Sequence, residues 1–376
     1  GGTPTTSNEA FWNGNIPWIQ SSDIVDGKLM GVEPRKYITQ TGLNNSATQL
    51  VPKDSIAIIT RVGVGKLAYM PFSYSTSQDF LSLSKLNTEP FFTVYACYKK
   101  LQSELNTVQG TSIKGITKDE LLAKTISVPV YSEQKQIGSF FTQLDTLITL
   151  HQRKYEKLVN IKKSMLDKMF PKNGASVPEI RFKGFTDLWE QRKLGEIAVF
   201  SKGVGYSKND LCEEGTPIIL YGRLYTKYET CIFDVDTFVK EKAGSVYSKG
   251  GEVIVPASGE TAEDISIASV VVKPGILLGG DLNIVSPTAE YDSAFLALTI
   301  SSGATHKYLS SLAQGKSVVH LHNSDIQSVS AKFPTKREQE KIHLIFGKID
   351  TLITLHQRKL EKLQNIKKSC LEKMFV

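Results

Sequence analysis

The decapeptide DTLITLHQRK occurs twice in this chain, at residues 145–154 and again at residues 350–359. Ten identical residues do not recur by chance within 376 residues, so the chain contains a duplicated unit. Extended at the same offset of 205 residues, the match covers 133–170 and 338–375, with 26 identities in 38 positions. This repeat decides the architecture, and the rest of the sequence is organised around it.

Each repeat has the pattern of one long helix. Neither copy contains an internal Pro, and apolar residues recur at a seven-residue interval, which is typical of a coiled-coil seam. Pro334, followed by Thr335 and Glu338 at the spacing of a capping box, marks the start of the second helix. Each helix would be about 57 Å long at about 1.5 Å per residue.

The seam needs a partner, and the two near-identical helices supply one for each other as an antiparallel coiled coil. A homo-oligomerising coiled coil is the alternative. We expect seam or partner-docking roles for a set of twelve residues, in which the two histidines are polar register positions rather than catalytic or metal-binding groups. The set comprises Leu144, Leu147, Ile148, His151, Leu158, Ile161, Ile349, Leu352, Ile353, His356, Leu363 and Ile366.

The segments that precede the two helices have diverged from each other. Both contain β-rich runs (55–60 and 252–258), then a helical stretch (88–105 and 293–313), then a Gln-Gly turn at Gln109-Gly110 and Gln314-Gly315. We predict the order domain (1–132), helix (133–172), linker and domain (173–337), helix (338–376). This is an α+β fold with two α/β-type domains. Antiparallel packing of equal helices creates a pseudo-twofold axis, which predicts an inverted orientation of the two domains. Two different modules held in this way suit a two-part DNA site.

Composition and charge narrow the class of protein. A hydrophobic content of 40% and a charged content of 22% fit a globular protein, and no apolar run approaches the roughly 20 residues of a membrane span. The chain opens GGTPTT without a Met or a signal peptide, so we expect a truncated or processed start. The cysteine usage predicts a cytoplasmic location. Four cysteines without paired spacing are expected to be reduced thiols, namely Cys97, Cys212, Cys231 and Cys370.

The net charge of +7 is concentrated in the repeats. Lys and Arg exceed Asp and Glu by five in 151–172 and by four in 356–375. A basic face of this kind indicates nucleic acid or an acidic protein partner. A merely solvated helix face is an equal alternative for Arg153, Lys154, Lys157, Lys162 and Lys163 and for their counterparts from Arg358 to Lys368.

Motifs of catalysis are absent from the sequence. It contains no GxxxxGK[ST] loop, no GxGxxG after a strand, no Pro-Pro, no Gly-x-Ser-x-Gly and no His-Glu-x-x-His. The run from Gly63 to Lys66 is predicted to be a turn between strands. His320 and His322 alternate on a predicted strand but lack a third metal ligand nearby. We therefore expect a binding protein with no catalytic and no metal-binding residue.

Candidate DNA contacts are basic, aromatic and amide residues in predicted loops. Arg and Lys can bind guanine edges or phosphates, and amides such as Asn283 and Asn323 can read adenine. A solvated surface role is the alternative for each residue. The candidates are Arg61, Lys66, Lys114, Lys202, Tyr206, Arg223, Tyr225, Lys227, Lys316, His320 and His322.

The sequence resembles the specificity subunit of type I restriction–modification enzymes. The resemblance covers the whole chain and is carried by the paired helix starts, Pro129 to Ile137 and Pro334 to Ile342, together with 1–24 and 188–203. The Trp-x-x-x-x-Leu-Gly motif at Trp189–Gly195 has no counterpart before Gly1, so about twenty residues of the first domain are expected to be missing. The second domain also lacks the Gly-Gly-Thr-Pro of the first.

The resemblance implies a DNA-binding subunit without its own active site. Each target recognition domain would read one half of an asymmetric, gapped sequence in double-stranded DNA. The two helices would set the gap and dock two modification subunits. No cofactor is expected on this subunit, because S-adenosylmethionine, ATP and Mg²⁺ belong to the modification and restriction partners. Two other hypotheses stay open, a coiled-coil scaffold whose domains bind proteins, and a stand-alone nuclease.

Overall fold

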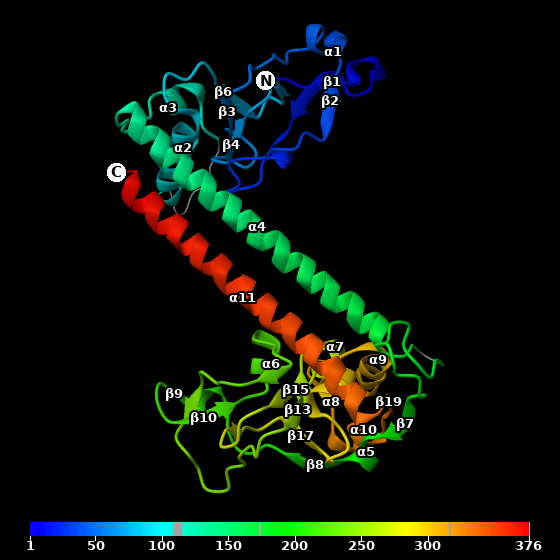
Figure 1. The fold of residues 1–376 in the computed structure, drawn as a ribbon. Helices are drawn as coiled ribbons and strands as arrows, with labels where there is room; N and C mark the ends of the chain where they lie inside the picture. Colours follow the sequence, from blue (N-terminus) through cyan, green and yellow to red (C-terminus); the bar gives the residue numbers. More distant parts are fainter. Residues whose placement is uncertain (108–114, 173, 316, 376) are drawn as a thin grey trace. The chain divides into compact units, whose positions relative to one another are not determined.

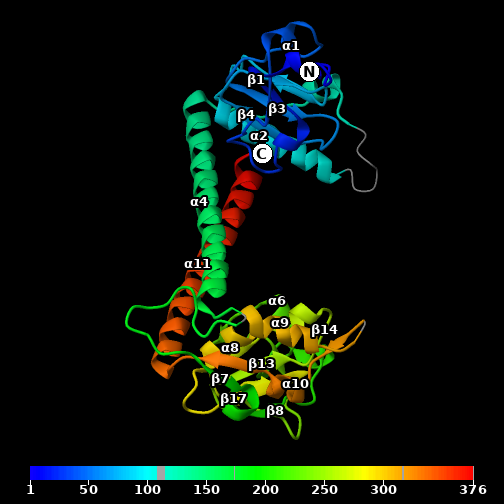
Figure 2. The ribbon, with the colours of Figure 1, turned by 90° about the vertical axis from the view of Figure 1, so that its right-hand side faces the viewer.

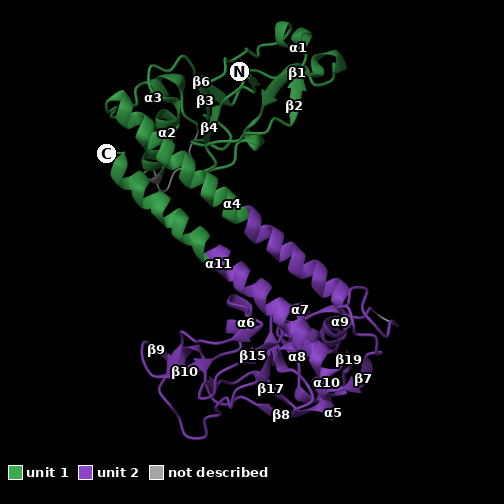
Figure 3. Ribbon diagram, viewed as in Figure 1, with its two compact units in different colours: residues 1–152, 358–376 green, residues 153–357 purple. Residues whose placement is uncertain are grey.

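The computed structural model describes residues 1–107, 115–172, 174–315 and 317–375. The chain divides into two compact units, which are residues 1–152 with 358–376 and residues 153–357 (Figure 3). Each unit contains one globular domain and parts of two long helices, α4 (Tyr131–Met169) and α11 (Lys336–Met374) (Figure 1). The Gln109-Gly110 turn and the candidates Lys114 and Lys316 lie outside the described residues.

The two long helices pack antiparallel, which confirms the predicted pairing. In the first unit the N-terminal part of α4 shares a core with the C-terminal end of α11, through Phe141, Leu144 and Leu371. In the second unit Phe170, at the end of α4, shares a core with Phe346 of α11. Because Phe141 and Phe346 are equivalent positions of the repeat, the same packing occurs twice in one chain.

Four of the twelve residues predicted for the seam or for partner docking do not lie in the seam. Leu147 and Leu352 are both 43% exposed, and Ile161 and Ile366 are both 37% exposed. Each of them follows a true seam position by three residues and therefore lies beside the narrow stripe that two packed helices bury. The other eight are buried or partly buried, so the central seam predicted to include Leu147 and Leu352 is wrong at these two residues.

The first domain has two three-stranded sheets, with strand orders β2-β1-β5 and β4-β3-β6. Helix α2 packs against the second sheet and shares its core with α4. The strands are β1 (Trp12–Ile19), β2 (Lys36–Ile38), β3 (Ser55–Ile59), β4 (Leu67–Met70), β5 (Ser75–Thr76) and β6 (Phe80–Leu83), and the helices are α1 (Gln40–Asn44), α2 (Pro90–Thr107) and α3 (Lys118–Leu122). Short 3-10 helices cover Glu9–Phe11 and Ser21–Asp23.

The second domain contains a five-stranded sheet of order β11-β15-β13-β17-β8 and a four-stranded sheet of order β16-β10-β12-β9. Pairs β14-β18 and β19-β7 complete it. The strands are β7 (Glu190–Lys193), β8 (Ala198–Lys202), β9 (Leu211–Cys212), β10 (Thr216–Ile219), β11 (Cys231–Ile232), β12 (Phe238–Val239), β13 (Glu252–Pro256), β14 (Ser258–Gly259), β15 (Ser269–Val271), β16 (Leu277–Leu278), β17 (Leu282–Pro287), β18 (Val319–His320) and β19 (Ser330–Phe333).

Helices of the second domain cover this framework. The almost fully buried α8 shares a core with β13 and β15 (Figure 2). The predicted helical stretch 293–313 is two helices, because the chain breaks at Ser301 and Ser302 and Gly303 adopts a φ of +62°. The helices are α5 (Leu194–Ile197), α6 (Arg223–Thr226), α7 (Ala262–Ile265), α8 (Ser293–Ile300), α9 (Gly303–Leu312) and α10 (Asn323–Ser328), with a 3-10 helix at Lys208–Asp210.

The two domains share a central three-stranded frame that the sequence barely shows. In the first, β3 lies between β4 and β6, with Ser55 opposite Met70 and Ile59 opposite Phe80. In the second, β13 lies between β15 and β17 in the same antiparallel arrangement, with Pro256 opposite Leu282. The mixed α/β fold with two related domains and two long helices is therefore confirmed.

Candidate nucleic-acid interface

Each long helix is fastened to its own domain by a buried glutamine. The Gln134 side chain accepts a hydrogen bond from the Glu89 amide (2.8 Å) and donates one to the Pro129 carbonyl (2.8 Å). Its repeat equivalent, Gln339, bonds in the same way to the Asp292 amide (2.9 Å) and the Pro334 carbonyl (2.9 Å). The glutamine of the paired helix-start motif is thus a structural clamp, and it occurs once in each unit.

The Asp that opens each DTLITLHQRK copy pairs with a Lys on the other helix. Asp145 lies 2.5 Å from Lys367 and accepts a hydrogen bond from Tyr95 Oη (2.6 Å). At the equivalent place, Asp350 lies 2.5 Å from Lys162 and accepts from a hydroxyl of the other domain (Thr230 Oγ1, 2.9 Å). Each pair ties both helices and one domain together, which gives one physical reason for the repeated sequence.

We predict equal losses of stability from Asp145→Ala and Asp350→Ala. Either change leaves a largely buried Lys without its partner and should cost about 2 kcal/mol. Urea midpoints and peptide-level hydrogen exchange would detect the loss in the first unit for Asp145→Ala and in the second for Asp350→Ala. Asp167→Ala is the matched control, because Asp167 is 65% exposed and its pair with Lys172 is solvated. Losses no larger than that of the control would contradict the prediction.

The central strand of each domain ends in the same backbone arrangement. The Thr60 amide donates to Asp79 (2.8 Å) and its carbonyl accepts from Ile116 (2.8 Å). In the second domain the Ala257 amide donates to the Asp281 carbonyl (2.8 Å), and its own carbonyl accepts from Leu321 (3.0 Å). We name this feature the strand-end frame. It places the residues after β3 and β13 next to a returning segment, which is the segment that follows α2 in the first domain and α9 in the second.

In the first domain the strand-end frame carries two of the predicted DNA contacts. Arg61 is exposed, and Lys66 is partly exposed after the Gly63–Lys66 turn, which joins β3 to β4 as predicted. Both line an open depression of about 340 Å³, together with Asp26 and Gln102. Neither cation forms an ion pair with any of the described residues. Both are available to a negatively charged ligand.

In the second domain four predicted contacts gather around the equivalent edge. His320 is exposed and its Nδ1 lies 3.1 Å from Ser258 Oγ, while Tyr225 donates its hydroxyl to the Ser258 carbonyl (2.6 Å). Burial raises the pKa of Tyr225, so this phenol stays protonated. Lys202, at the end of β8, and His322 are also exposed. The prediction that His322 lies on a strand is wrong, because it precedes α10 as its N-cap.

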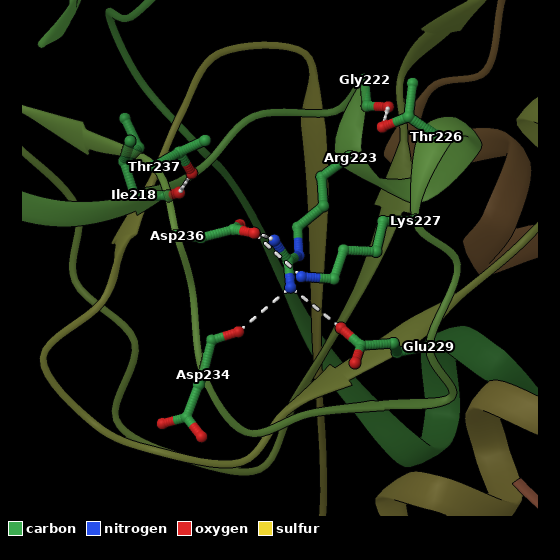
Figure 4. Close-up of polar contacts among 9 residues, drawn as sticks. All are labelled: Ile218, Gly222, Arg223, Thr226, Lys227, Glu229, Asp234, Asp236 and Thr237. Atoms are coloured by element: carbon green, nitrogen blue, oxygen red, sulfur yellow. Dashed lines mark hydrogen bonds and ion pairs between the residues drawn. The ribbon is translucent and has the colours of Figure 1, made fainter. Parts of the chain in front are cut away.

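Three other candidates are held by partners within the second domain. Arg223 is buried and donates to Asp236 (2.7 Å), to Glu229 (2.9 Å) and to a backbone carbonyl (Figure 4). Lys227 bonds the other Asp236 oxygen (2.9 Å), and Lys227 and Arg223 together lower the pKa of Asp236 to about 2. Tyr206 is buried and its hydroxyl contacts Ser245 (2.6 Å). Arg223 and Tyr206 are buried and support the domain, whereas Lys227 is exposed and paired with Asp236.

The two amide candidates are also committed to the scaffold. Asn283 is fully buried and donates to the Leu321 carbonyl (2.8 Å). Asn323 donates to the Ser201 carbonyl (2.9 Å). The first bond joins β17 to the residue after β18, and the second joins α10 to β8. Both residues position the backbone of the strand-end frame through their side chains.

A buried charge lies beside the sheet that contains β1 in the first domain and beside the sheet that contains β10 in the second, and its sign is reversed between the domains. In the first domain, buried Asp23 pairs with exposed Arg35 (3.4 Å) just before β2. In the second, the buried residue is Arg223 and its exposed partner Asp236 precedes β12. The flanking strand pairs match, since β1 and β10 each lie between one parallel and one antiparallel neighbour. One scaffold therefore carries opposite charge patterns at its surface.

An ion pair in the second unit makes its stability depend on pH. His343 Nδ1 lies 2.9 Å from Asp292 Oδ1, and this pairing raises the pKa of His343. Burial raises the pKa of Asp292, but His343 and the Phe295 amide outweigh it and lower the net value. The His contribution to stability is present below its unfolded pKa of about 6.5 and is lost as pH rises through the higher folded value.

We predict that the second unit loses stability between pH 6 and pH 8 and that His343→Leu removes this loss. Urea midpoints resolved by hydrogen exchange would measure it. The first unit is an internal control, because the equivalent position is Gly138 and carries no ionisable group. An equal change in both units would assign the pH dependence to other residues.

Within the described ranges, no cluster of three or more His, Cys, Asp or Glu could hold a metal ion. The four cysteines are free thiols, and burial raises the pKa of Cys97 and of Cys231 to about 11. No helix in these ranges is long and apolar enough to cross a membrane.

Comparison with known proteins identifies the family of this chain. The family model "Type I restriction modification DNA specificity domain" matches residues 1–160 and 186–365. The MjaIX type I restriction enzyme specificity subunit of Methanocaldococcus jannaschii is 23% identical over the whole of this chain and 89% of its own length.

Two solved structures have a similar fold. The type I restriction–modification S subunit from M. genitalium has a TM-score of 0.64 at 15% identity, over 100% of this chain and 93% of that one. A chain from a study of complex assembly and conformational transition of the type I system has a TM-score of 0.50 at 15% identity, over 96% and 90%. This chain therefore belongs to the family of type I restriction–modification DNA specificity subunits, which recognise the target sequence while catalytic activity lies in partner subunits.

Proposed function

We propose that the chain reads an asymmetric, two-part DNA sequence, with one half-site for each domain. The observation that carries this proposal is the contrast between backbone and side chains in the two domains. The strand-end frame is the same in both, whereas the residues that project from it differ, as Arg61 and His320 do. One scaffold with two sets of exposed side chains suits two different half-sites. The domain boundaries and the inverted orientation predicted from the sequence belong to this proposal.

The two long helices are proposed to dock two copies of one modification subunit. Each unit presents the same apolar side chains to solvent, which are Leu147, Leu150 and Ile366 in the first and Leu352, Leu355 and Ile161 in the second. Repeat-related residues have nearly equal exposure, for example 45% at Leu150 and 44% at Leu355. Two matching apolar surfaces on one chain are what two identical partners require.

Methyl transfer and cleavage are assigned to the partner subunits in this proposal. S-adenosylmethionine, ATP and Mg²⁺ would bind there, and restriction subunits would join the same assembly in the cytoplasm. The basic helix residues, such as Arg153 and Lys154, are proposed to face acidic partner surfaces or the phosphates of the spacer DNA. Lys162 and Lys367 are excluded from this role by their ion pairs.

Co-expression with a type I modification subunit, followed by genome-wide mapping of methylated adenine, tests the proposal. The expected result is one gapped, non-palindromic motif, and duplex binding by the purified complex should weaken steeply as salt rises. Leu147→Asp and Leu352→Asp should each remove one modification subunit, as measured by native mass spectrometry. A palindromic motif, or no gapped motif at all, would overturn the proposal. Salt-insensitive binding would favour the protein-binding scaffold.

A further inference from the structure

Among the described residues, the strand-end frame presents a projecting basic side chain in each domain, and the two side chains lie on different segments of the frame. In the first domain that residue is Arg61, directly after Thr60. The facing position on the returning segment is Gly115. In the second domain the residue after Ala257 is the small Ser258, and the facing position carries His320. Positions 115 and 320 are separated by the same 205 residues as the two helix repeats.

A steric constraint explains why the large side chain follows the central strand in the first domain and lies on the returning segment in the second. Gly115 has a φ of +119°, and a Cβ there would lie 3.0 Å from the Thr60 carbonyl oxygen. No residue with a side chain adopts this conformation without strain. The returning segment of the first domain is thereby closed to a reading residue at position 115, and the strand itself supplies Arg61.

In the second domain the smaller strand residue orients the larger one. Ser258 faces His320 across the β14-β18 pair, and its hydroxyl contacts the ring at Nδ1 (3.1 Å). The Tyr225 hydroxyl donates to the Ser258 carbonyl, and a Cβ at Gly259 would lie 2.8 Å from the same hydroxyl. The His320 ring is thus fixed through one nitrogen, and its Nε2 has no partner among the described residues.

We infer that Arg61 and His320 are the specificity-determining residues of the two domains, reading base edges from different segments of the strand-end frame. Arg61 has the forked donors that match the O6 and N7 acceptors of guanine in the major groove. His320 offers one ring nitrogen and therefore makes one hydrogen bond to a base edge. Lys66 lies beside Arg61 in the same depression and binds the adjacent phosphate. The two domains consequently approach their half-sites from different sides of one frame.

This inference rests on the proposed function, and adenine-methylation mapping of the intact complex separates the two. Arg61→Ala should relax one or two base positions in one half of the motif, with roughly a tenfold or greater loss of preference for the native base. His320→Ala should relax positions only in the other half. Arg61→Lys should relax the same positions as Arg61→Ala, because it keeps the charge and loses the fork.

The matched controls lie at the far ends of the two central strands, β3 and β13. Lys53 and Lys249 are exposed and precede β3 and β13, so Lys53→Ala and Lys249→Ala should leave the motif unchanged. An unchanged motif in Arg61→Ala and His320→Ala would overturn the inference. A uniform fall in methylation without a change of motif would assign the two residues to phosphate contacts and also overturn it. If the proposed function itself were wrong, the wild-type chain would give no two-part motif, which distinguishes that outcome from failure of this inference.

Discussion

Replacing Gln339 with Leu is expected to destabilise the second unit by about 3 kcal/mol. Gln339 is only 1% exposed, and its two hydrogen bonds satisfy the Asp292 amide and the Pro334 carbonyl. Leu has a similar volume and fills the space, but it leaves both backbone groups buried and unpaired, at about 1–3 kcal/mol each. The Asp292 side chain also caps α8, so loosening its backbone weakens the central helix of the domain.

The same change at Gln134 should have nearly the same effect, confined to the first unit. Urea unfolding followed by peptide-level hydrogen exchange measures each unit separately, which a single transition of the whole chain would not do. Gln143→Leu is the matched control, since Gln143 is exposed on the same helix as Gln134 and, among the described residues, its side chain bonds Ser139 alone. If Gln339→Leu and Gln134→Leu matched the control, the glutamines would not be clamps.

Replacing Arg223 with Met is expected to cost the second unit about 3 kcal/mol. The buried guanidinium donates to two carboxylates and one carbonyl (Figure 4). Removing it leaves Asp236 and Glu229 to be hydrated and the Asp234 carbonyl without its donor, and charge-assisted bonds of this kind contribute about 1.5–3 kcal/mol each. The total is less than the sum, because Asp236 keeps its bond from Lys227.

Arg223→Lys should recover only part of this loss, because an ammonium group cannot reproduce the fork that spans the two carboxylates. Hydrogen-exchange protection should fall around β10 and β12, while the first unit is unaffected. Arg192→Met is the matched control, since Arg192 pairs with Glu190 at the surface and its loss should leave the urea midpoint unchanged. If Arg223→Met weakened DNA binding without lowering hydrogen-exchange protection, Arg223 would be a DNA contact and not a structural residue.

The sequence repeat predicted both long helices and their pairing, because the spacing of apolar residues along a helix shows which face packs against a partner. Both copies form 39-residue helices that pack antiparallel, and Gln134 and Gln339 belong to the motif that marked their starts. The prediction of Leu147 as a central seam residue was wrong, because an apolar residue three positions after a seam position lies beside the buried stripe. The repeated identity also carries the cross-helix ion pairs, since Asp145 pairs with Lys367, the equivalent of Lys162, and Lys162 pairs with Asp350, the equivalent of Asp145.

The exposure of the candidate DNA contacts was harder to predict, because charge in a loop does not distinguish a buried, paired group from a free one. Arg61 and Arg223 look alike in the sequence, yet one is exposed and the other is surrounded by carboxylates. The only signal for Arg223 was the acidic stretch that follows it, including Glu229 and Asp236. Distinguishing the two residues requires knowing which strands bring those carboxylates back.

The sequence by itself determined the two long helices, their antiparallel pairing and the family, since these depend on local period and on a repeat visible along the chain. Tertiary structure alone decided that the two diverged domains share one strand-end frame, and that Asp23 and Arg223 place opposite buried charges beside the sheets that contain β1 and β10. It also decided that Arg61 follows the central strand of its domain, whereas His320 lies on the returning segment. The physical reason is that a β frame is held by backbone hydrogen bonds between distant segments. Those bonds constrain geometry and leave the side chains free to diverge.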